Sequence, residues 1–240
     1  MAEAKHYRVT LIGISPLLMN ADNIEEQDKL IAWRKIPENS AITVKGDDRT
    51  PGWTWTTRLC HDKSIVGIPR TYIEAALRDA GKKMPFPGGG KETFKRYTQS
   101  GMSIEGGDYM LPLRYGDGYR RSLTVKDINA IAKINDFSEH LTLVAKLGFN
   151  LYINRVPIGM NGKHVRVRPV FDEWQTEFNL VVDDEDLSAL KLPVLENLFR
   201  VAGTQIGIGD WRPSAPSTPG SYGRFLAIIK PVIKAGRSKK

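Results

Sequence analysis

Glycine, arginine and aromatic residues are interleaved in the segment 203–225, GTQIGIGDWRPSAPSTPGSYGRF. Glycine lets a backbone approach a ligand closely, so that peptide amides can reach a phosphate. Arginine neutralises phosphate charge, while indole and phenol rings stack on the faces of bases. This combination of residue types favours nucleic acid as the ligand. We predict that the contacts come from Gly207, Gly209, Trp211, Arg212, Tyr222 and Arg224.

Basic residues outside this segment are further candidates for contact with nucleic acid. One group follows three consecutive glycines, 88–90, in a stretch that we expect to be exposed and flexible. The string GGGK lacks the spacing of a nucleotide-binding phosphate loop, so we exclude nucleotide hydrolysis. A second basic and aromatic group occupies 114–121, where a solvated hairpin is an equally good interpretation. The candidates outside the glycine-rich segment are Arg70, Lys91, Lys95, Arg96, Arg120 and Arg121.

The composition describes a basic protein with an ordinary share of apolar residues. A formal net charge of +8 and a pI near 9.5 favour a polyanionic partner, because lysine and arginine release counterions when they neutralise phosphates. Hydrophobic residues at 41% predict a folded chain. Cys60 is the only cysteine, which excludes an internal disulfide and a cysteine-rich zinc site. No histidine pair has zinc-ligand spacing, so we predict neither a metal nor a cofactor.

Membrane association has no support in the sequence. No apolar run approaches the length that crosses a bilayer, and the first residues, MAEAKHYRV, lack the apolar core of a signal peptide. We therefore expect a cytoplasmic protein without a membrane partner.

The elements that position these residues follow from apolar periodicity. A strand ends at Pro16, a helix follows Pro69, and a second helix with leucines at mostly helical spacing precedes the glycine-rich segment. Strands are expected at 164–171 and 176–182, and a last strand begins after the glycines. In chain order these elements alternate as strand, helix, strand, strand, helix, strand. The sequence therefore predicts an α+β, ferredoxin-like βαββαβ core.

Long insertions separate the parts of this predicted core within a single domain of residues 1–240. The core segments are 5–15, 68–83 and 163–232, the insertions are 16–67 and 84–162, and a basic tail occupies 234–240. Within the first insertion, Trp53 and Trp55 could form a base-stacking face. Two tryptophans two residues apart fill a core or an interface more often, so burial is the preferred interpretation.

Three segments resemble the RAMP superfamily, the repeat-associated mysterious proteins of CRISPR systems. The glycine-rich segment between the last helix and last strand resembles the hallmark of that superfamily, and HYRVTLIGISPLLM is similar to its first strand. IPRTYIEAALRDAGKK, residues 68–83, is similar to the segment that opens the first helix of backbone-type subunits. It departs from the family pattern at Arg70 and Thr71, where Gly-Ser is usual, and at Ala75, where glycine is common.

The resemblance implies a subunit that binds guide RNA without reading its sequence. In such subunits the first helix and the glycine loop lie along single-stranded RNA, and an inserted thumb separates short runs of bases. The implied partners are the guide RNA, further copies of the protein in a head-to-tail filament, and other subunits of a ribonucleoprotein effector complex.

Two other functions remain open on the same resemblance. One is an RNA-processing endoribonuclease, for which the family suggests an acid after the first strand or a histidine. Asp22 and Asp28 are the acids in that position, although solvation of a surface turn is the preferred interpretation for both, with a helix cap as a further role for Asp22. The other is a phage or mobile-element protein that coats single-stranded nucleic acid. We favour a binding subunit over an enzyme.

Overall fold

The computed structural model describes residues 4–62, 64–106, 109–158, 162–183 and 189–232, and these form an α+β structure. Its main sheet has the strand order β10–β1–β9–β4, and all of these pairs are antiparallel. The strands are β1 (Lys5–Gly13), β4 (Met102–Ile104), β9 (Trp174–Val182) and β10 (Phe225–Pro231). A short strand, β6 (Arg114–Tyr115), also pairs with β9. No helix among the described residues is long and apolar enough to cross a membrane.

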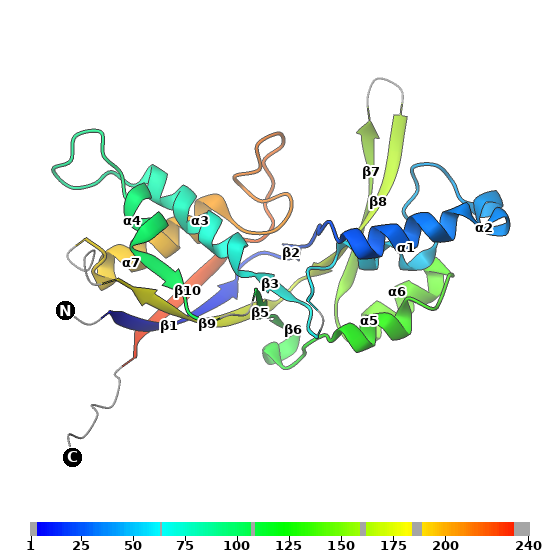
Figure 1. Ribbon diagram of the computed structural model, residues 1–240, viewed down its shortest axis with the longest axis horizontal. Helices are drawn as coiled ribbons and strands as arrows, with labels where there is room; N and C mark the ends of the chain where they lie inside the picture. The colour runs from blue at the N-terminus through cyan, green and yellow to red at the C-terminus, as the bar shows by residue number, and fades with distance from the viewer. Residues whose placement is uncertain (1–3, 63, 107–108, 159–161, 184–188, 233–240) are drawn as a thin grey trace, which may run out of the picture.

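Two amphipathic helices cover one face of this sheet (Figure 1). In α3 (Arg70–Lys83) the buried residues Ile73, Ala76, Leu77 and Ala80 recur at helical spacing, so a single stripe of the helix faces the sheet. Helix α7 (Leu192–Val201) does the same with Leu195, Leu198 and Phe199. The expected helices after Pro69 and before the glycine-rich segment are confirmed.

Four of the other α-helices gather around a second sheet at the other end of the molecule (Figure 1). This sheet has the order β2–β8–β7, with β7 and β8 forming a long antiparallel hairpin. These four α-helices and a 3₁₀ helix, η1 (Gly52–Arg58), lie around it. The bounds are β2 (Leu17–Leu18), β7 (Asn150–Ile158), β8 (Gly162–Phe171), α1 (Ile24–Lys35), α2 (Pro37–Ile42), α5 (Val125–Ile131) and α6 (Phe137–Leu147).

Short elements connect the two ends. Strands β3 (Gly67–Pro69) and β5 (Met110–Pro112) pair with each other, α4 (Lys95–Ser100) packs beside α3, and η2 (Asp117–Tyr119) follows β6. The buried apolar residues of both ends belong to one continuous core. At the second end this core is aromatic, since Trp55 lies 5.7 Å from Phe149, and Phe149 stacks on Phe171 at 5.0 Å, measured between ring centroids. Trp53 and Trp55 are both buried, as preferred from the sequence.

Two boundaries differ from the expectations. The segment 163–171, assigned to the core, lies in the second sheet, whereas 102–104, assigned to an insertion, supplies the strand that completes the main sheet. The glycine-rich loop begins at Gly207 instead of Gly203, because a π-helical turn, Ala202–Ile206, continues α7. Gly203 packs on β10 there, and a side chain at this position would meet the carbonyl oxygen of Phe225 at 2.0 Å. The basic tail 234–240 lies outside the described residues.

A buried histidine makes the stability of the second end depend on pH. Trp55 Nε1 donates to His140 Nδ1 at 3.1 Å, so the other ring nitrogen, Nε2, carries the proton and donates to the carbonyl oxygen of Ile134 at 2.8 Å. Burial lowers the pKa of His140 from its ordinary value of 6.5. The unfolded chain therefore takes up a proton at a pH where the folded protein does not.

We expect the free energy of unfolding to fall as the pH is lowered through 6.5, the ordinary pKa, by up to about 1.4 kcal/mol per pH unit from this group. His140→Gln, which keeps an amide donor and an acceptor, should flatten that decline. Thermal and urea unfolding of both proteins at several pH values between about 5.5 and 7.5 would measure the difference. An equally steep decline in the variant would show that His140 is not the responsible group.

Candidate functional site

Backbone contacts hold the glycine-rich loop, residues 207–224, against the connection between β1 and β2. The amide of Asp210 donates to Leu18 and that of Gly223 donates to Pro16, at 2.9 and 2.8 Å. A side chain at Gly223 would meet the carbonyl oxygen of Ile208 at 1.8 Å, and one at Gly209 would meet that of Leu18 at 2.6 Å. Both glycines also have positive φ. These glycines therefore permit close packing of the loop on its own fold.

The role expected for the Gly207 amide does not fit this arrangement. Gly207 is buried and its N–H donates to the carbonyl oxygen of Ala202 at 2.8 Å, where it ends the π-helical turn. This amide is therefore used inside the fold and not directed at a phosphate. Gly209 lines a pocket between the loop and α3, together with Arg212.

Aromatic rings from the glycine-rich loop and from the β7–β8 hairpin pack against one another. Trp211 and Tyr222 stack with their ring centroids 6.0 Å apart and their planes 19° apart. Tyr152, on β7, packs edge-on against both rings at 5.9 and 5.8 Å. Trp211 has a φ of 49°, a left-handed conformation that costs a non-glycine residue about 1 kcal/mol or more. The fold holds this indole in place despite that cost.

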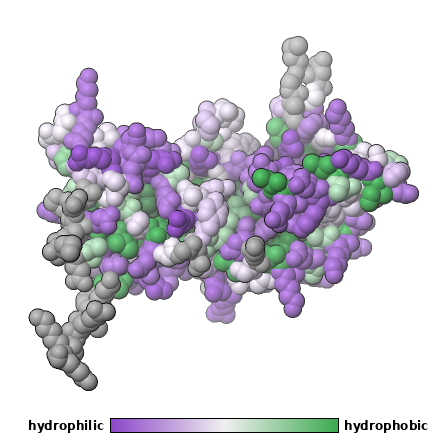
Figure 2. All heavy atoms as spheres, in the orientation of Figure 1, coloured by the Kyte–Doolittle hydropathy of each residue, from purple (hydrophilic) through white to green (hydrophobic). Residues whose placement is uncertain are grey.

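A groove separates the loop from the β7–β8 hairpin, and Figure 2 shows it as a notch in the outline of the molecule. One wall is the hairpin, with Arg155, Arg166 and Arg168, and the other is the loop, with Trp211 and residues 215–218. The groove thus combines arginines with a partly buried aromatic cluster. These side chains can neutralise phosphates and stack on bases.

Ion pairs fix two of these arginines. Arg168 pairs with Asp210, which links the hairpin to the loop, and Arg166 lies 3.5 Å from Asp48, from Nη1 to Oδ1. Both acids are partly or fully buried, with 28% and 11% of the side chain exposed. The guanidinium groups therefore have fixed positions before any ligand binds.

Two loop arginines from the sequence prediction have structural contacts. Arg212 donates from Nε to Ser214 Oγ at 3.1 Å and from Nη1 to the carbonyl oxygen of Gly209 at 3.2 Å. The backbone amide of Arg224 donates a hydrogen bond to Ser15 Oγ at 2.9 Å. The buried Nε of the same residue has no hydrogen-bond partner among the described residues. Arg212 faces the pocket beside α3, on the other side of the loop from the groove.

The predicted candidates outside the loop do not line the groove. Arg70 begins α3 and donates to the carbonyl oxygen of Gly106 at 3.1 Å. Arg96 lies over the Tyr97 ring at 4.8 Å on α4, with Lys91 and Lys95 exposed nearby in sequence. Arg121 donates to the carbonyl oxygen of Lys146, near the end of α6, at 2.9 Å, and Arg120 is exposed.

The acids considered for catalysis are also separate from the groove lining. Asp22 and Asp28 are exposed, the first just before the residue that caps α1 and the second on α1 itself. Asn23, not Asp22, occupies the cap position. Among the described residues there is no group of three or more histidines, cysteines or acids that could hold a metal ion.

Sequence reasoning missed the hairpin half of the groove, namely Tyr152, Arg155, Arg166 and Arg168. The alternation of Val165 and Val167 with Arg166 and Arg168 did show that these arginines share one strand face. It could not show which segment that face meets. Comparison with known proteins adds no information here, since no protein-family model and no curated protein matches the sequence.

The link between hairpin and loop predicts an energetic coupling of Arg168 and Asp210. A double-mutant cycle with Arg168→Met and Asp210→Asn should give a coupling of about 1 kcal/mol in urea unfolding, because both side chains are mostly buried. The exposed pair Arg8 and Glu177 on the main sheet is the control, and its coupling should be smaller. A coupling no larger than that of the control pair would mean that the ion pair does not hold the loop.

Proposed function

We propose that this protein binds single-stranded nucleic acid, specifically RNA, in the groove between the glycine-rich loop and the β7–β8 hairpin. The observation that carries the proposal is the meeting of the Trp211 and Tyr152 rings with three arginines along one groove, namely Arg155, Arg166 and Arg168. Tyr222 supports the indole by stacking on it. Base faces suit the rings whatever the sequence, and arginines suit the backbone phosphates. Binding with little sequence preference follows.

The strand order supports a ferredoxin-like core as part of this proposal. Helix α3 lies between β1 and β4 in the chain, and α7 lies between β9 and β10. With the sheet order β10–β1–β9–β4, these six elements have the arrangement of a split βαβ pair, with β4 in place of the expected strand at 164–171. The β7–β8 hairpin is inserted between β4 and β9, and in this proposal it serves as the thumb.

The RAMP resemblance extends the proposal to assembly. We propose that the protein is a backbone subunit that packs head to tail with copies of itself along guide RNA, in a cytoplasmic ribonucleoprotein with other subunits. The hydrolytic alternative gains no support from the histidines. His140 is buried with both ring nitrogens engaged, and the histidines His6, His61 and His164 do not line the groove.

Replacing a ring of the aromatic cluster tests the groove directly. Trp211→Ala should weaken binding of single-stranded RNA by about 1 to 3 kcal/mol, because the indole lines the groove and can stack on a base. Tyr222→Ala removes the ring that stacks on Trp211 and should also weaken binding. Tyr109→Ala, which removes an exposed tyrosine outside the groove, is the matched control and should bind as the wild type does. Fluorescence anisotropy with several unrelated RNA sequences would measure the affinities, with thermal melting of each variant to verify folding.

Three results would contradict the proposal. They are no RNA binding even at low salt, binding restricted to one sequence, and equal losses for Tyr109→Ala and the groove variants. Binding to single-stranded DNA of the same sequences distinguishes an RNA-binding protein from one that coats any single strand. Equal affinities for RNA and DNA would favour the coating protein.

The assembly part of the proposal predicts a stoichiometry that increases with RNA length. A head-to-tail contact that does not close adds one subunit for each further length of RNA that it covers. Mass photometry on RNA of increasing length should therefore give a ladder of complexes. A constant one-to-one complex on all lengths would rule out assembly along RNA while leaving binding in the groove intact.

A further inference from the structure

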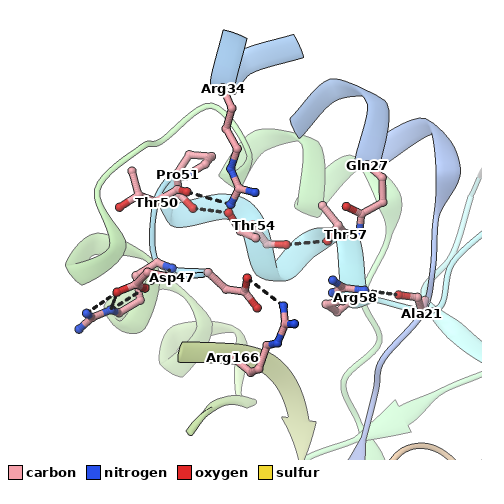
Figure 3. A network of polar contacts seen from close by, with 12 residues as sticks. Ala21, Gln27, Arg34, Asp47, Thr50, Pro51, Thr54, Thr57, Arg58 and Arg166 are labelled. Carbon is pink, nitrogen blue, oxygen red and sulfur yellow. Dashed lines mark hydrogen bonds and ion pairs between the residues drawn. The ribbon is translucent and has the colours of Figure 1, made fainter. Parts of the chain in front are cut away.

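A small polar pocket lies between η1 and β8, at one end of the groove. Its lining residues are Asn20, Asp48, Arg58, Arg166 and Arg168. The Arg166 side chain extends from β8 toward Arg58 on η1 (Figure 3), and both line the pocket. Three guanidinium groups from two separate segments of the chain therefore surround one space. Like charges gathered in this way repel unless an anion lies between them.

Arg58 differs from the other two arginines in its partners. Arg166 and Arg168 each have a carboxylate, from Asp48 and Asp210. Arg58 has no carboxylate within 4.0 Å among the described residues, and its side-chain hydrogen bond, to the carbonyl oxygen of Ala21, is long at 3.4 Å. The guanidinium is thus partly buried without a direct ion pair.

The surroundings of Arg58 disfavour its charge. Burial is the main cause that lowers the pKa of Arg58, and the nearby Arg166 and Arg168 lower it further, while Asp48 and Asp22 act in the opposite direction. Arginine stays protonated in proteins, so the protein bears this penalty as lost stability. Such an arrangement is typical of binding sites, where a ligand supplies the missing charge.

We propose that this pocket binds one phosphate group, with the Arg58 guanidinium as its principal ligand and Arg166 and Arg168 completing the shell. Guanidinium groups donate two parallel hydrogen bonds to phosphate oxygens, which suits three of them around one tetrahedral anion. Asp48 and Asp210 hold the two flanking arginines in position. Because the three residues belong to η1 and β8, the anion also bridges the 3₁₀ helix and the hairpin.

The charge balance selects the kind of phosphate. The three guanidinium groups and the two paired carboxylates leave one net positive charge at the pocket. A phosphodiester carries a single negative charge and neutralises it, whereas a terminal phosphate carries about −1.5 to −2 at neutral pH. Asp22 is exposed and its effect is screened by solvent and salt. The ligand assigned is therefore an internal phosphodiester of the nucleic acid, an identity that rests on the proposed function.

Melting experiments without RNA test the pocket independently of that function. Thermal unfolding is followed in dimethyl phosphate, in inorganic phosphate and in sodium chloride, all at one ionic strength. Dimethyl phosphate at about ten times its Kd should raise Tm by about 2 to 5 °C over chloride. Arg58→Met should abolish this rise, and its Tm without phosphate should equal or exceed that of the wild type, because repulsion is relieved. Arg200→Met, on the exposed side of α7, is the control and should keep the rise.

Opposite results in these melts overturn the proposal. A phosphate-dependent rise that persists in Arg58→Met would place the anion elsewhere, and no rise in the wild type at any concentration would exclude the pocket. A lower Tm for Arg58→Met in chloride would mean that Arg58 has a structural role instead. If Arg58→Met fails to fold, Arg58→Lys replaces it, since lysine keeps the charge but loses the paired hydrogen bonds and should reduce the rise.

RNA binding then distinguishes the source of the phosphate. Arg58→Met should make the slope of log K against log salt shallower by about 0.7, the value for one phosphate of a single strand. RNA with and without a 5′-phosphate should bind equally well. The assignment to an internal phosphodiester would be overturned if the wild type bound the 5′-phosphorylated strand more tightly and Arg58→Met removed this preference. Phosphate stabilisation without any RNA binding would refute the proposed function and the phosphodiester assignment, while the anion pocket itself would stand.

Discussion

The close packing of the glycine-rich loop on the β1–β2 connection is the constraint on which the candidate site depends. Peptide groups of Leu18 and Pro16 accept hydrogen bonds from the loop, and glycine is needed where the loop backbone passes within contact distance of Leu18 and Ile208. Because both sides of this contact are backbone, it fixes the loop without using its exposed side chains. Trp211, Tyr222 and Asp210 are thereby free to face the hairpin.

Charge provides the second connection between loop and hairpin. Asp210 pairs with Arg168 across the groove, so an acid that reduces the net positive charge of the site also sets its geometry. Asp48 does the same for Arg166. Arg58 shares the small pocket with these two arginines, is partly buried, and has no carboxylate within 4.0 Å among the described residues. Two of the three arginines at this small pocket are thus held in defined pairs and the third is not, and the phosphate that we propose there would have a specific position.

The open face of the main sheet contributes little to this site. On β1 it presents Arg8 and Thr10, which contact Glu177 on β9, and on β10 it exposes Leu226 and Ile228. Lys230 on β10 adds one exposed cation to this face, beside Arg8. The arginine is paired with Glu177, and the side chains named here include no aromatic ring that could stack on a base. The candidate residues gather instead at the edge of the core, where the loop after α7 meets an inserted hairpin. The candidate site therefore depends on the inserted hairpin as much as on the loop.

Local physics determined what the sequence alone could predict. Apolar residues at helical spacing gave the two helices on the sheet, and the density of glycine and proline gave the loop between the second helix and the last strand, because these patterns act within a few neighbouring residues. The nucleic-acid ligand, which we inferred from the types of side chain on that loop, stays a prediction. The burial of Trp53 and Trp55 followed from the same kind of reasoning.

Contacts between distant segments were decided only by the tertiary structure. Strand β4 has three residues and no pattern of its own, so its place beside β9 depends on the surface that β9 offers. The more regular strand β8 pairs with β7 instead, because a long hairpin satisfies its backbone locally. Arg58 and Arg166 are more than one hundred positions apart in the chain, yet they line the same pocket. Periodicity places a residue on a face of its own element, and only the packing of elements decides what that face meets.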